Sequence, residues 1–339
     1  MIGMMKPLPR RRFIQLVAAS GASGALQGMA RPQANVHRWS GMAMGAGASL
    51  EIRHENAREG ERLLLLARKE IIRLENIFSL YKPDSALSLL NRQGHLSTPP
   101  QDLVELLSIC GDVHKATNGA FDPTVQPLWA YHAETLSGAR IASDPGFQQA
   151  RSLSGWARFE FSPELVEFNT PGGGALTLNG IAQGYATDKV AAILRANGLG
   201  NVLVSVGEIL AHGERGPGQP WRTGIETPGE ATATIKLPLR DQAIATTAPL
   251  ATTFDQDGRI GHILDPWTGC PADSQWRQIS VIHSSAALAD GLSTGMALMN
   301  KAAITQTAQA FNNIRVIAIQ TNTNNVDEMT CYPKSWCPS

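Results

Sequence analysis

The chain changes from strand to helix within Leu178-Asn179-Gly180-Ile181-Ala182-Gln183-Gly184-Tyr185-Ala186-Thr187-Asp188, where two glycines flank a turn. A short strand is predicted before the turn, over 175–178, and a helix after it, from Tyr185 to about Ala196. Asn197-Gly198 ends that helix, and a buried strand follows over 202–206. A turn of this kind can offer main-chain N–H groups to a phosphate or carbonyl oxygens to a metal ion.

Outward from this stretch, strand and helix patterns follow one another without regular alternation. Helices are predicted over 58–78, 103–116 and 286–299, and strands over 44–52, 157–161, 165–169, 221–226, 232–237, 278–282 and 314–319. The glycine-rich pieces do not form the Gly-x-Gly-x-x-Gly pattern of a dinucleotide-binding domain. We therefore predict an α+β fold, in which mixed or antiparallel sheets pack with helices in a single domain.

Composition sets broad limits on the partners of this protein. The chain has 339 residues, 43% of them hydrophobic, so a packed core is expected. Its 29 basic and 29 acidic residues balance, which gives no general reason to expect nucleic acid or an anionic membrane as a partner. An anionic ligand would have to be held by a local site.

The N-terminal residues have the features of an export signal. Arg10-Arg11-Arg12-Phe13 precedes a weakly apolar stretch, and Gly28-Met29-Ala30 offers small residues for cleavage. We predict a twin-arginine signal over 1–30, a linker over 31–43, a folded domain over 44–320 and a tail over 321–339, with the mature protein in the periplasm. The alternative is a basic terminus that arose by chance. No later apolar run approaches the roughly 20 residues of a membrane helix.

Four cysteines, Cys110, Cys270, Cys331 and Cys337, contain no Cys-x-x-Cys pair of the kind that binds metal. In an oxidising compartment Cys331 and Cys337 could close a small disulfide loop, or both could remain free thiols.

A carboxylate and a hydroxyl share one face of the predicted helix over 286–299. Asp290 and Thr294 lie four residues apart in an otherwise small and apolar segment. A hard cation such as Mg²⁺ would satisfy both with oxygen ligands. A helix cap or a salt bridge would also account for Asp290.

Two further turns carry polar side chains. In His262-Ile263-Leu264-Asp265-Pro266, a histidine close to a carboxylate could serve as a general base, or the segment could be a structural turn. In Asn118-Gly119-Ala120-Phe121-Asp122-Pro123-Thr124, a ring and a carboxylate could hold a planar ligand, or Phe121 could anchor a loop.

Taken together and in this order, these segments resemble the ApbE family of FAD:protein FMN transferases, over about 44–300. The resemblance rests on Met44-Gly45, on Phe78-Ser79-Leu80-Tyr81 with Leu90-Asn91, on the turns around Phe121, Gly180 and His262, and on Ala289-Asp290-x-Leu292-x-Thr294. The chain departs from the family pattern at Thr177, Gln183, Val206-Gly207-Glu208 and Ala245-Thr246-Thr247-Ala248.

The resemblance implies a role for each site residue. Mg²⁺ would be held by Asp290, Thr294 and the main-chain carbonyl of Gly180. FAD, the substrate, would contact Met44, Tyr81, Ala120, Phe121, Asp122 and Ile263, with Thr177 and Gln183 near the nucleotide. His262 would be the catalytic base, oriented by Asp265.

The resemblance also implies the reaction, in which FMN passes from FAD to a Ser or Thr hydroxyl of a partner protein and AMP is released. The acceptor would be an exported or membrane-anchored electron-transfer protein. Two alternatives use the same site: a Mg²⁺-dependent FAD pyrophosphatase, and a periplasmic FAD-binding protein without transferase turnover.

Overall fold

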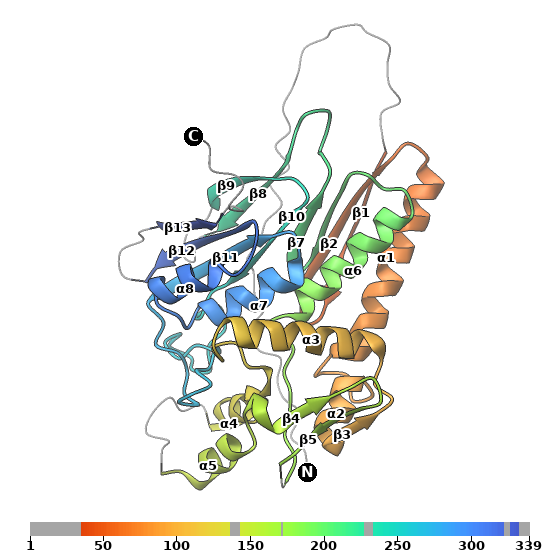
Figure 1. Ribbon diagram of the computed structural model, residues 1–339. Coiled ribbons are helices and arrows are strands. Elements are labelled where there is room, and N and C mark those ends of the chain that lie inside the picture. Colours follow the sequence, from red (N-terminus) through yellow and green to blue (C-terminus); the bar gives the residue numbers. More distant parts are fainter. Residues whose placement is uncertain (1–34, 136–142, 171, 227–232, 322–325, 332–339) are drawn as a thin grey trace, which may run out of the picture.

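The computed structural model describes residues 35–331 except 136–142, 171, 227–232 and 322–325 (Figure 1). Within these residues, no helix is both long and apolar enough to cross a bilayer. The predicted signal over 1–30 lies outside the described residues, as does Cys337 of the predicted Cys331–Cys337 pair.

Eight strands form one antiparallel sheet through the upper part of the molecule (Figure 1). In spatial order they are β1 (Asn35–Ala43), β2 (Ala46–His54), β6 (Val202–Val206), β7 (Glu208–His212), β10 (Gln242–Thr247), β11 (Trp276–His283), β12 (Ile314–Gln320) and β13 (Val326–Cys331). Both faces are covered, because neighbouring residues of one strand enter different cores: Val202 and Val204 join the larger core, and Leu203 joins the smaller one.

Helices cover one face of this sheet. They are α1 (Ala57–Phe78), α6 (Ala182–Ala196), α7 (Ala286–Met296) and α8 (Lys301–Ala308), and α3 (Gln101–Ala116) crosses beneath them (Figure 1). The apolar stripe of α1, which includes Leu63, Ala67, Ile71 and Leu74, is buried in the larger core. The other face is covered by a two-stranded sheet of β8 (Trp221–Glu226) and β9 (Ala233–Leu239).

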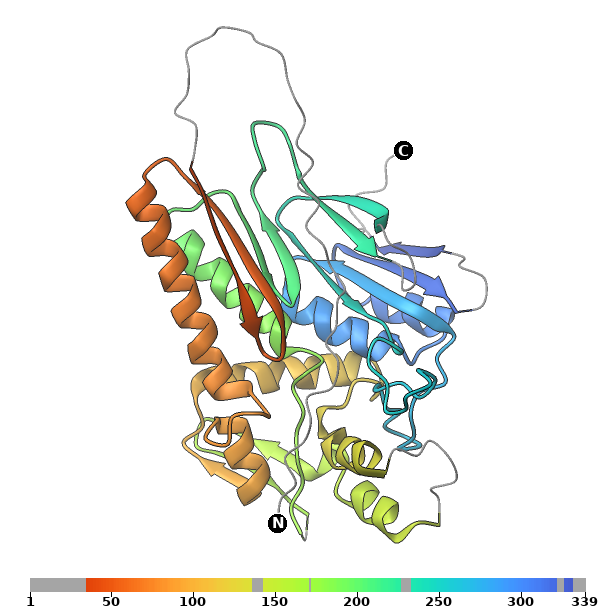
Figure 2. The same ribbon diagram turned by 180° about the vertical axis from the view of Figure 1, so that it is seen from behind.

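The lower part of the molecule contains shorter elements. They are α2 (Ala86–Gln93), β3 (His95–Ser97), α4 (Gln126–Thr135), α5 (Pro145–Ser152), β4 (Phe159–Phe161) and β5 (Leu165–Phe168), with single 3₁₀ turns at Pro123–Val125 and Trp156–Arg158. The three strands form a small sheet of order β3-β5-β4. From behind, the β1–β2 hairpin points its turn toward this lower part (Figure 2).

The α+β prediction is confirmed, and the predicted helices and most predicted strands lie close to their expected positions. Helix α7 ends at Met296, three residues before the predicted end, and Asn300 caps the next helix by accepting a hydrogen bond from Ala303 N at 2.9 Å. The elements that the sequence patterns did not predict are β1, α2, β3, α4, α5, β7, β10, α8 and β13.

The strand predicted over 175–178 is absent. Its backbone is paired with a side chain instead: Asn91 Nδ2 donates to Leu176 O, and Leu176 N donates to Asn91 Oδ1, both at 2.8 Å. One amide group thereby takes both main-chain bonds of Leu176 that a neighbouring strand would otherwise make.

Ordered strands extend beyond both ends of the predicted domain. Residues 35–43, placed in the linker, form β1 and pair along their whole length with β2, from Asn35↔His54 to Ala43↔Ala46. At the other end, part of the predicted tail forms β13 on the edge of β12. The hydrogen bonds of partner strands order these segments, although neither has a strong apolar pattern of its own.

Helices α6 and α7 pack backbone to backbone. A Cβ atom at Gly184 would lie 2.2 Å from Ala286 O, and one at Gly291 would lie 3.0 Å from a methyl group of Ile181. Only glycine at position 184 permits the observed separation of the two helices.

We expect Gly184→Ala to lower the free energy of unfolding by about 1–3 kcal/mol, because the added methyl group must push α7 away from α6. Urea unfolding followed by circular dichroism measures the change. Gly200→Ala is the matched control, since a Cβ there meets no atom within 4 Å. Equal stability of the two variants would contradict the packing argument.

Candidate active site

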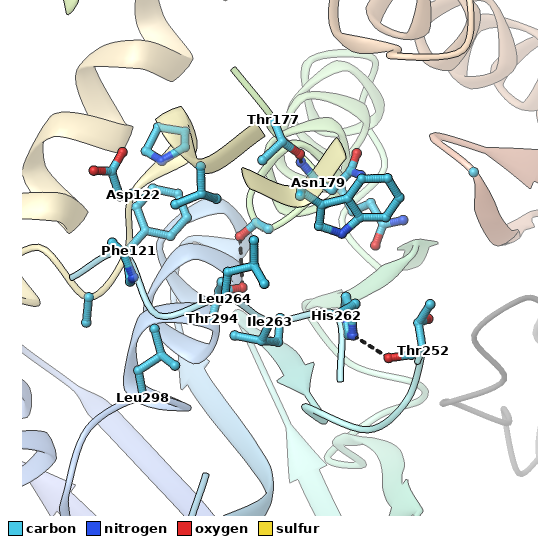
Figure 3. Close-up of a pocket in the computed structure, with 18 of the residues that line it drawn as sticks. Phe121, Asp122, Thr177, Asn179, Thr252, His262, Ile263, Leu264, Thr294 and Leu298 are labelled. Atoms are coloured by element: carbon cyan, nitrogen blue, oxygen red, sulfur yellow. Dashed lines mark hydrogen bonds between the residues drawn. The ribbon is translucent and has the colours of Figure 1, made fainter. Parts of the chain in front are cut away.

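One cavity lies where the lower ends of α6 and α7 meet the loops of the lower part (Figure 3). Its lining comes from five stretches of sequence: the β1–β2 turn, 120–129, 177–183, 252–266 and 294–298, together with Tyr81. The predicted site residues Met44, Tyr81, Ala120, Phe121, Asp122, Thr177, Gly180, Gln183, His262, Ile263 and Thr294 all line it. Asp265 and Asp290 are not among the lining residues.

Three oxygen-bearing groups meet between α6 and α7. Asp290, only 3% exposed, accepts a hydrogen bond from Gly184 N through Oδ2 at 3.0 Å. One helical turn further along α7, Thr294 Oγ1 lies 3.3 Å from Gly180 O. At the usual Mg–O distance, two adjacent octahedral ligands lie about 3 Å apart, so the hydroxyl and the carbonyl are spaced as a shared magnesium ion requires.

The close approach of Thr294 requires a glycine at position 180. A Cβ atom there would lie 2.9 Å from Thr294 Oγ1 and 3.0 Å from its methyl carbon. A side chain at this position would therefore displace the hydroxyl that faces the carbonyl.

The donor set consists of hard oxygen atoms. Among the described residues there is no group of three or more His, Cys, Asp or Glu side chains that could hold a metal ion. A site built from one carboxylate, one hydroxyl and one carbonyl contains only one residue of those types, and a substrate phosphate can supply further oxygen ligands. The residues present therefore fit Mg²⁺ better than a softer metal, which prefers nitrogen or sulfur.

The start of α7 is held by Asp188, whose role the sequence did not reveal. Its carboxylate accepts hydrogen bonds from Ser285 Oγ at 2.8 Å, Ala286 N at 2.8 Å and Ala287 N at 3.0 Å. Burial raises the pKa of Asp188, and these three bonds oppose that shift by stabilising the ionised form. Next to it, burial lowers the pKa of His283, whose Nδ1 accepts from Ser285 N at 3.0 Å. Asp188 on α6 thus orients the helix that carries Asp290.

The main-chain N–H groups of the glycine turn are largely used inside the protein. Ile181 N and Ala182 N donate to Leu178 O at 3.1 and 2.8 Å, and Gly184 N donates to Asp290. Of the two uses that the sequence left open for this turn, the carbonyl that faces a metal therefore fits better than N–H groups that hold a phosphate.

The imidazole of His262 is oriented by main-chain carbonyls (Figure 3). Its Nδ1 lies 3.0 Å from Thr252 O and 3.2 Å from Pro249 O. Because a carbonyl can only accept, Nδ1 carries the proton, and Nε2 is the basic nitrogen of the neutral ring. His262 lines the cavity in the tautomer that a general base requires.

The hydrogen bonds of the Asp265 side chain lie in its own turn, and its predicted role beside His262 stays a prediction. Its Oδ1 accepts from Trp267 N at 2.8 Å and from Thr268 N at 3.3 Å, as in a side-chain-stabilised turn. We therefore assign Asp265 to the turn that supports the histidine segment, while the loop of Pro249 and Thr252 orients the ring.

Phe121 and Asp122 form one wall of the cavity. Phe121 is 4% exposed, and its N–H donates to Thr117 Oγ1 at 3.0 Å. Asp122 Oδ1 accepts from the N–H and the hydroxyl of Thr124, at 2.8 and 2.6 Å. Phe121 thus offers little of its ring, and Tyr81, which is 70% exposed, is the more open aromatic side chain at the cavity.

The turn between β1 and β2 carries backbone strain. Met44 has φ 49° and Gly45 has φ 78°, so a methionine occupies a left-handed position that favours glycine. Gln183 Nε2 donates to Met44 O at 3.4 Å, and its side chain packs on Gly207, where a Cβ would lie 2.5 Å from it. The strained residue lines the cavity, as functional residues in such conformations often do.

The cavity also contains residues that sequence reasoning missed, among them Trp129, Asn179, Thr252, Leu264 and Leu298. Asn179 stood inside the quoted glycine-turn stretch, so its position was a usable signal. Leu264 stood inside the quoted histidine turn, and Leu298 lies in the predicted helix of Asp290 and Thr294. Trp129 and Thr252 come from segments without such a motif, and only the fold brings them to the site.

Comparison with known proteins identifies the family. The model of the ApbE family matches residues 44–318. The chain is 29% identical over 306 residues to the FAD:protein FMN transferase of Vibrio cholerae serotype O1, covering 87% of this chain and 90% of that protein. It is 30% identical over 258 residues to the FAD:protein FMN transferase of Haemophilus influenzae, covering 71% and 73%.

Solved structures agree with this match. Flavin transferase ApbE from Vibrio cholerae superposes with a TM-score of 0.74 at 26% identity, covering 88% of this chain and 97% of that one. The apo form of Pseudomonas stutzeri flavinyl transferase ApbE superposes with a TM-score of 0.75 at 25% identity, covering 88% and 95%. Fold, cavity and sequence therefore lead to one conclusion: this chain belongs to the ApbE family.

Proposed function

We propose that this protein is an FAD:protein FMN transferase, which moves FMN from FAD to a Ser or Thr hydroxyl of a partner protein and releases AMP. The observation that carries the proposal is the convergence, in one cavity, of Thr294, Gly180 and His262 with the expected flavin contacts. The carboxylate of Asp290 lies one helical turn before Thr294 on α7. The family and the similar transferases described above support the reaction class.

The proposed reaction breaks one phosphoanhydride bond and forms one phosphoester. The acceptor hydroxyl oxygen attacks the FMN phosphorus, and the bond from that phosphorus to the bridging oxygen breaks. AMP leaves with the bridging oxygen, and FMN remains attached to the acceptor. His262 Nε2 takes the proton of the attacking hydroxyl, since its Nδ1–H is directed at the carbonyls of Thr252 and Pro249.

The charge of the cavity supports a role for a metal ion. None of the described residues that line it is Lys or Arg, whereas the pyrophosphate of FAD is anionic. Asp290, Thr294 and Gly180 would hold Mg²⁺. When bound, the ion would neutralise charge that develops on the phosphates in the transition state.

We also propose that the protein is exported by its twin-arginine sequence and acts in the periplasm on an exported or membrane-anchored electron-transfer protein. The motif around Arg11 supports this proposal. Replacement of Arg10, Arg11 and Arg12 by Lys should retain the protein in the cytoplasm in cell fractionation. Unchanged periplasmic recovery would contradict export by this route.

The first test is incubation of the mature protein with FAD, Mg²⁺ and a panel of candidate acceptor domains, followed by intact mass spectrometry. We expect one acceptor to gain a single FMN, with AMP released, and no adduct to form when EDTA is present during the incubation. Free FMN and AMP without an adduct would establish the pyrophosphatase instead. Bound, unchanged FAD across the panel would establish an FAD-binding protein, and reversion of the departures at Thr177 and Gln183 would then be the next experiment.

Asp290→Asn should lower the transfer rate about 100-fold or more, because it removes the one charged ligand of the proposed metal site. Asparagine keeps an oxygen that can accept from Gly184 N, so the melting temperature should change little. Asp327→Asn, the same substitution in an exposed ion pair with Lys301, is the matched control. A normal transfer rate in Asp290→Asn would refute the metal assignment.

Met44→Gly should lower the affinity for FAD without lowering the stability of the fold. Glycine relieves about 1–3 kcal/mol of left-handed strain but loses more chain entropy on folding, so stability should hold or rise by about 1 kcal/mol. FAD affinity should fall roughly tenfold, since an apolar contact with the ligand is lost. Thermal unfolding and flavin fluorescence titration measure the two effects.

Asn313→Gly serves as the control for Met44→Gly. Asn313 has φ 56° and does not line the cavity, so its replacement should leave FAD affinity unchanged. Equal FAD affinity in Met44→Gly and the wild type would remove Met44 from the binding site.

A further inference from the structure

A buried hydroxyl on the sheet faces the proposed metal ligand on α7. Thr247, at the end of β10, is 6% exposed, and its Oγ1 lies 2.8 Å from Ser293 Oγ and 3.3 Å from Thr294 Oγ1. Ser293 is fully buried and donates to the main-chain oxygen of Asp290 at 2.9 Å. Three hydroxyl groups therefore form a continuous chain that begins at the cavity and ends inside α7.

Counting the protons shows which hydroxyl donates and which accepts in this hydrogen-bonded series. Each hydroxyl has one proton to donate. Ser293 uses its proton on Asp290 O, so it can only accept from Thr247. Thr247 thus gives its proton to Ser293, and a lone pair of Thr247 Oγ1 remains available toward Thr294.

That lone pair could accept the proton of Thr294 when a cation is bound. Without a cation, Thr294 donates its proton to Gly180 O. A cation shared by Gly180 O and Thr294 Oγ1 would repel a proton that lies between those two oxygens. The proton of Thr294 must then turn to another acceptor, and Thr247 Oγ1 is in place to receive it.

We propose that Thr247 is a positioning residue for the metal site. It accepts the proton of Thr294 and so turns a lone pair of that hydroxyl toward the ion. The inference rests on the proposed function, because it takes Thr294 and Gly180 as metal ligands. Outer partners of this kind orient metal ligands and commonly change metal affinity about 10–100-fold.

The neighbouring residue Thr246 provides a matched control. Its Oγ1 lies 2.9 Å from Ser280 Oγ of β11, and none of its hydrogen bonds reaches α7. Thr246→Val therefore removes a hydroxyl of the same type from the same strand without touching the chain that leads to Thr294.

The test is calorimetric titration of the mature protein with Mg²⁺ in the presence of saturating FAD. No acceptor is added, so FMN is not transferred. Thermal unfolding is measured separately, in EDTA. We expect Thr247→Val to weaken Mg²⁺ binding about 10–100-fold, while Thr247→Ser and Thr246→Val bind as the wild type does. In EDTA, Thr247→Val should melt close to the wild type, because Ser293 and Thr294 keep their carbonyl acceptors. Transfer should recover as Mg²⁺ is raised.

Several results would overturn the inference. Wild-type Mg²⁺ affinity in Thr247→Val would show that Thr247 does not position the ligand, and the proposed function would stand. Failure of Thr247→Ser to restore affinity would point to packing instead of the hydroxyl. If the wild type binds no Mg²⁺ while it transfers FMN, the metal assignment and this inference both fall.

A second variant keeps the inference testable if Thr247→Val does not fold. Ser293→Ala removes the acceptor of the Thr247 proton, so that proton turns toward Thr294 and opposes the proposed orientation. We expect weaker Mg²⁺ binding in Ser293→Ala as well. Wild-type affinity in this variant would contradict the directed chain.

Discussion

The direct backbone contact between α6 and α7 is the constraint on which the site depends. Because Gly184 has no side chain, Ala286 can approach α6 closely, and Gly184 N reaches the carboxylate of Asp290. The same approach brings Gly180 O to Thr294 at one end of the contact and lets Asp188 hold the start of α7 at the other. A larger separation would break all of these contacts together.

The site is built to satisfy its polar groups whether or not a ligand is bound. The carboxylate of Asp188 has three donors, and the hydroxyls of Thr247 and Ser293 bond to each other. Buried polar groups without partners would destabilise the fold by roughly 1–3 kcal/mol each. A network that can redirect one proton, at Thr294, would provide the proposed metal ligand and would leave no unpaired group when no ion is bound.

The remaining walls of the cavity are loops held by main-chain bonds. Carbonyls of Pro249 and Thr252 select the tautomer of His262, and Asp265 stabilises the turn that follows it. Met44 holds its left-handed conformation in a hairpin whose two strands, β1 and β2, pair along their whole length. Helix α7 and the turn before α6 thus carry the proposed metal ligands, and loops carry the proposed base and most of the expected flavin contacts.

The sequence by itself determined the α+β class, the long helices and about half of the residues that line the cavity. Apolar periodicity located the helices, because it is a local signal, and the short motifs that resemble the ApbE family located the site residues. It could not determine β1 and β13, whose order comes from partner strands, or the strand wrongly predicted near Leu176, where Asn91 takes the backbone bonds. It also could not reveal the roles of Asp188 and Thr247. These roles arise only when α6, α7 and β10 pack, since each joins atoms that lie tens of residues apart along the chain.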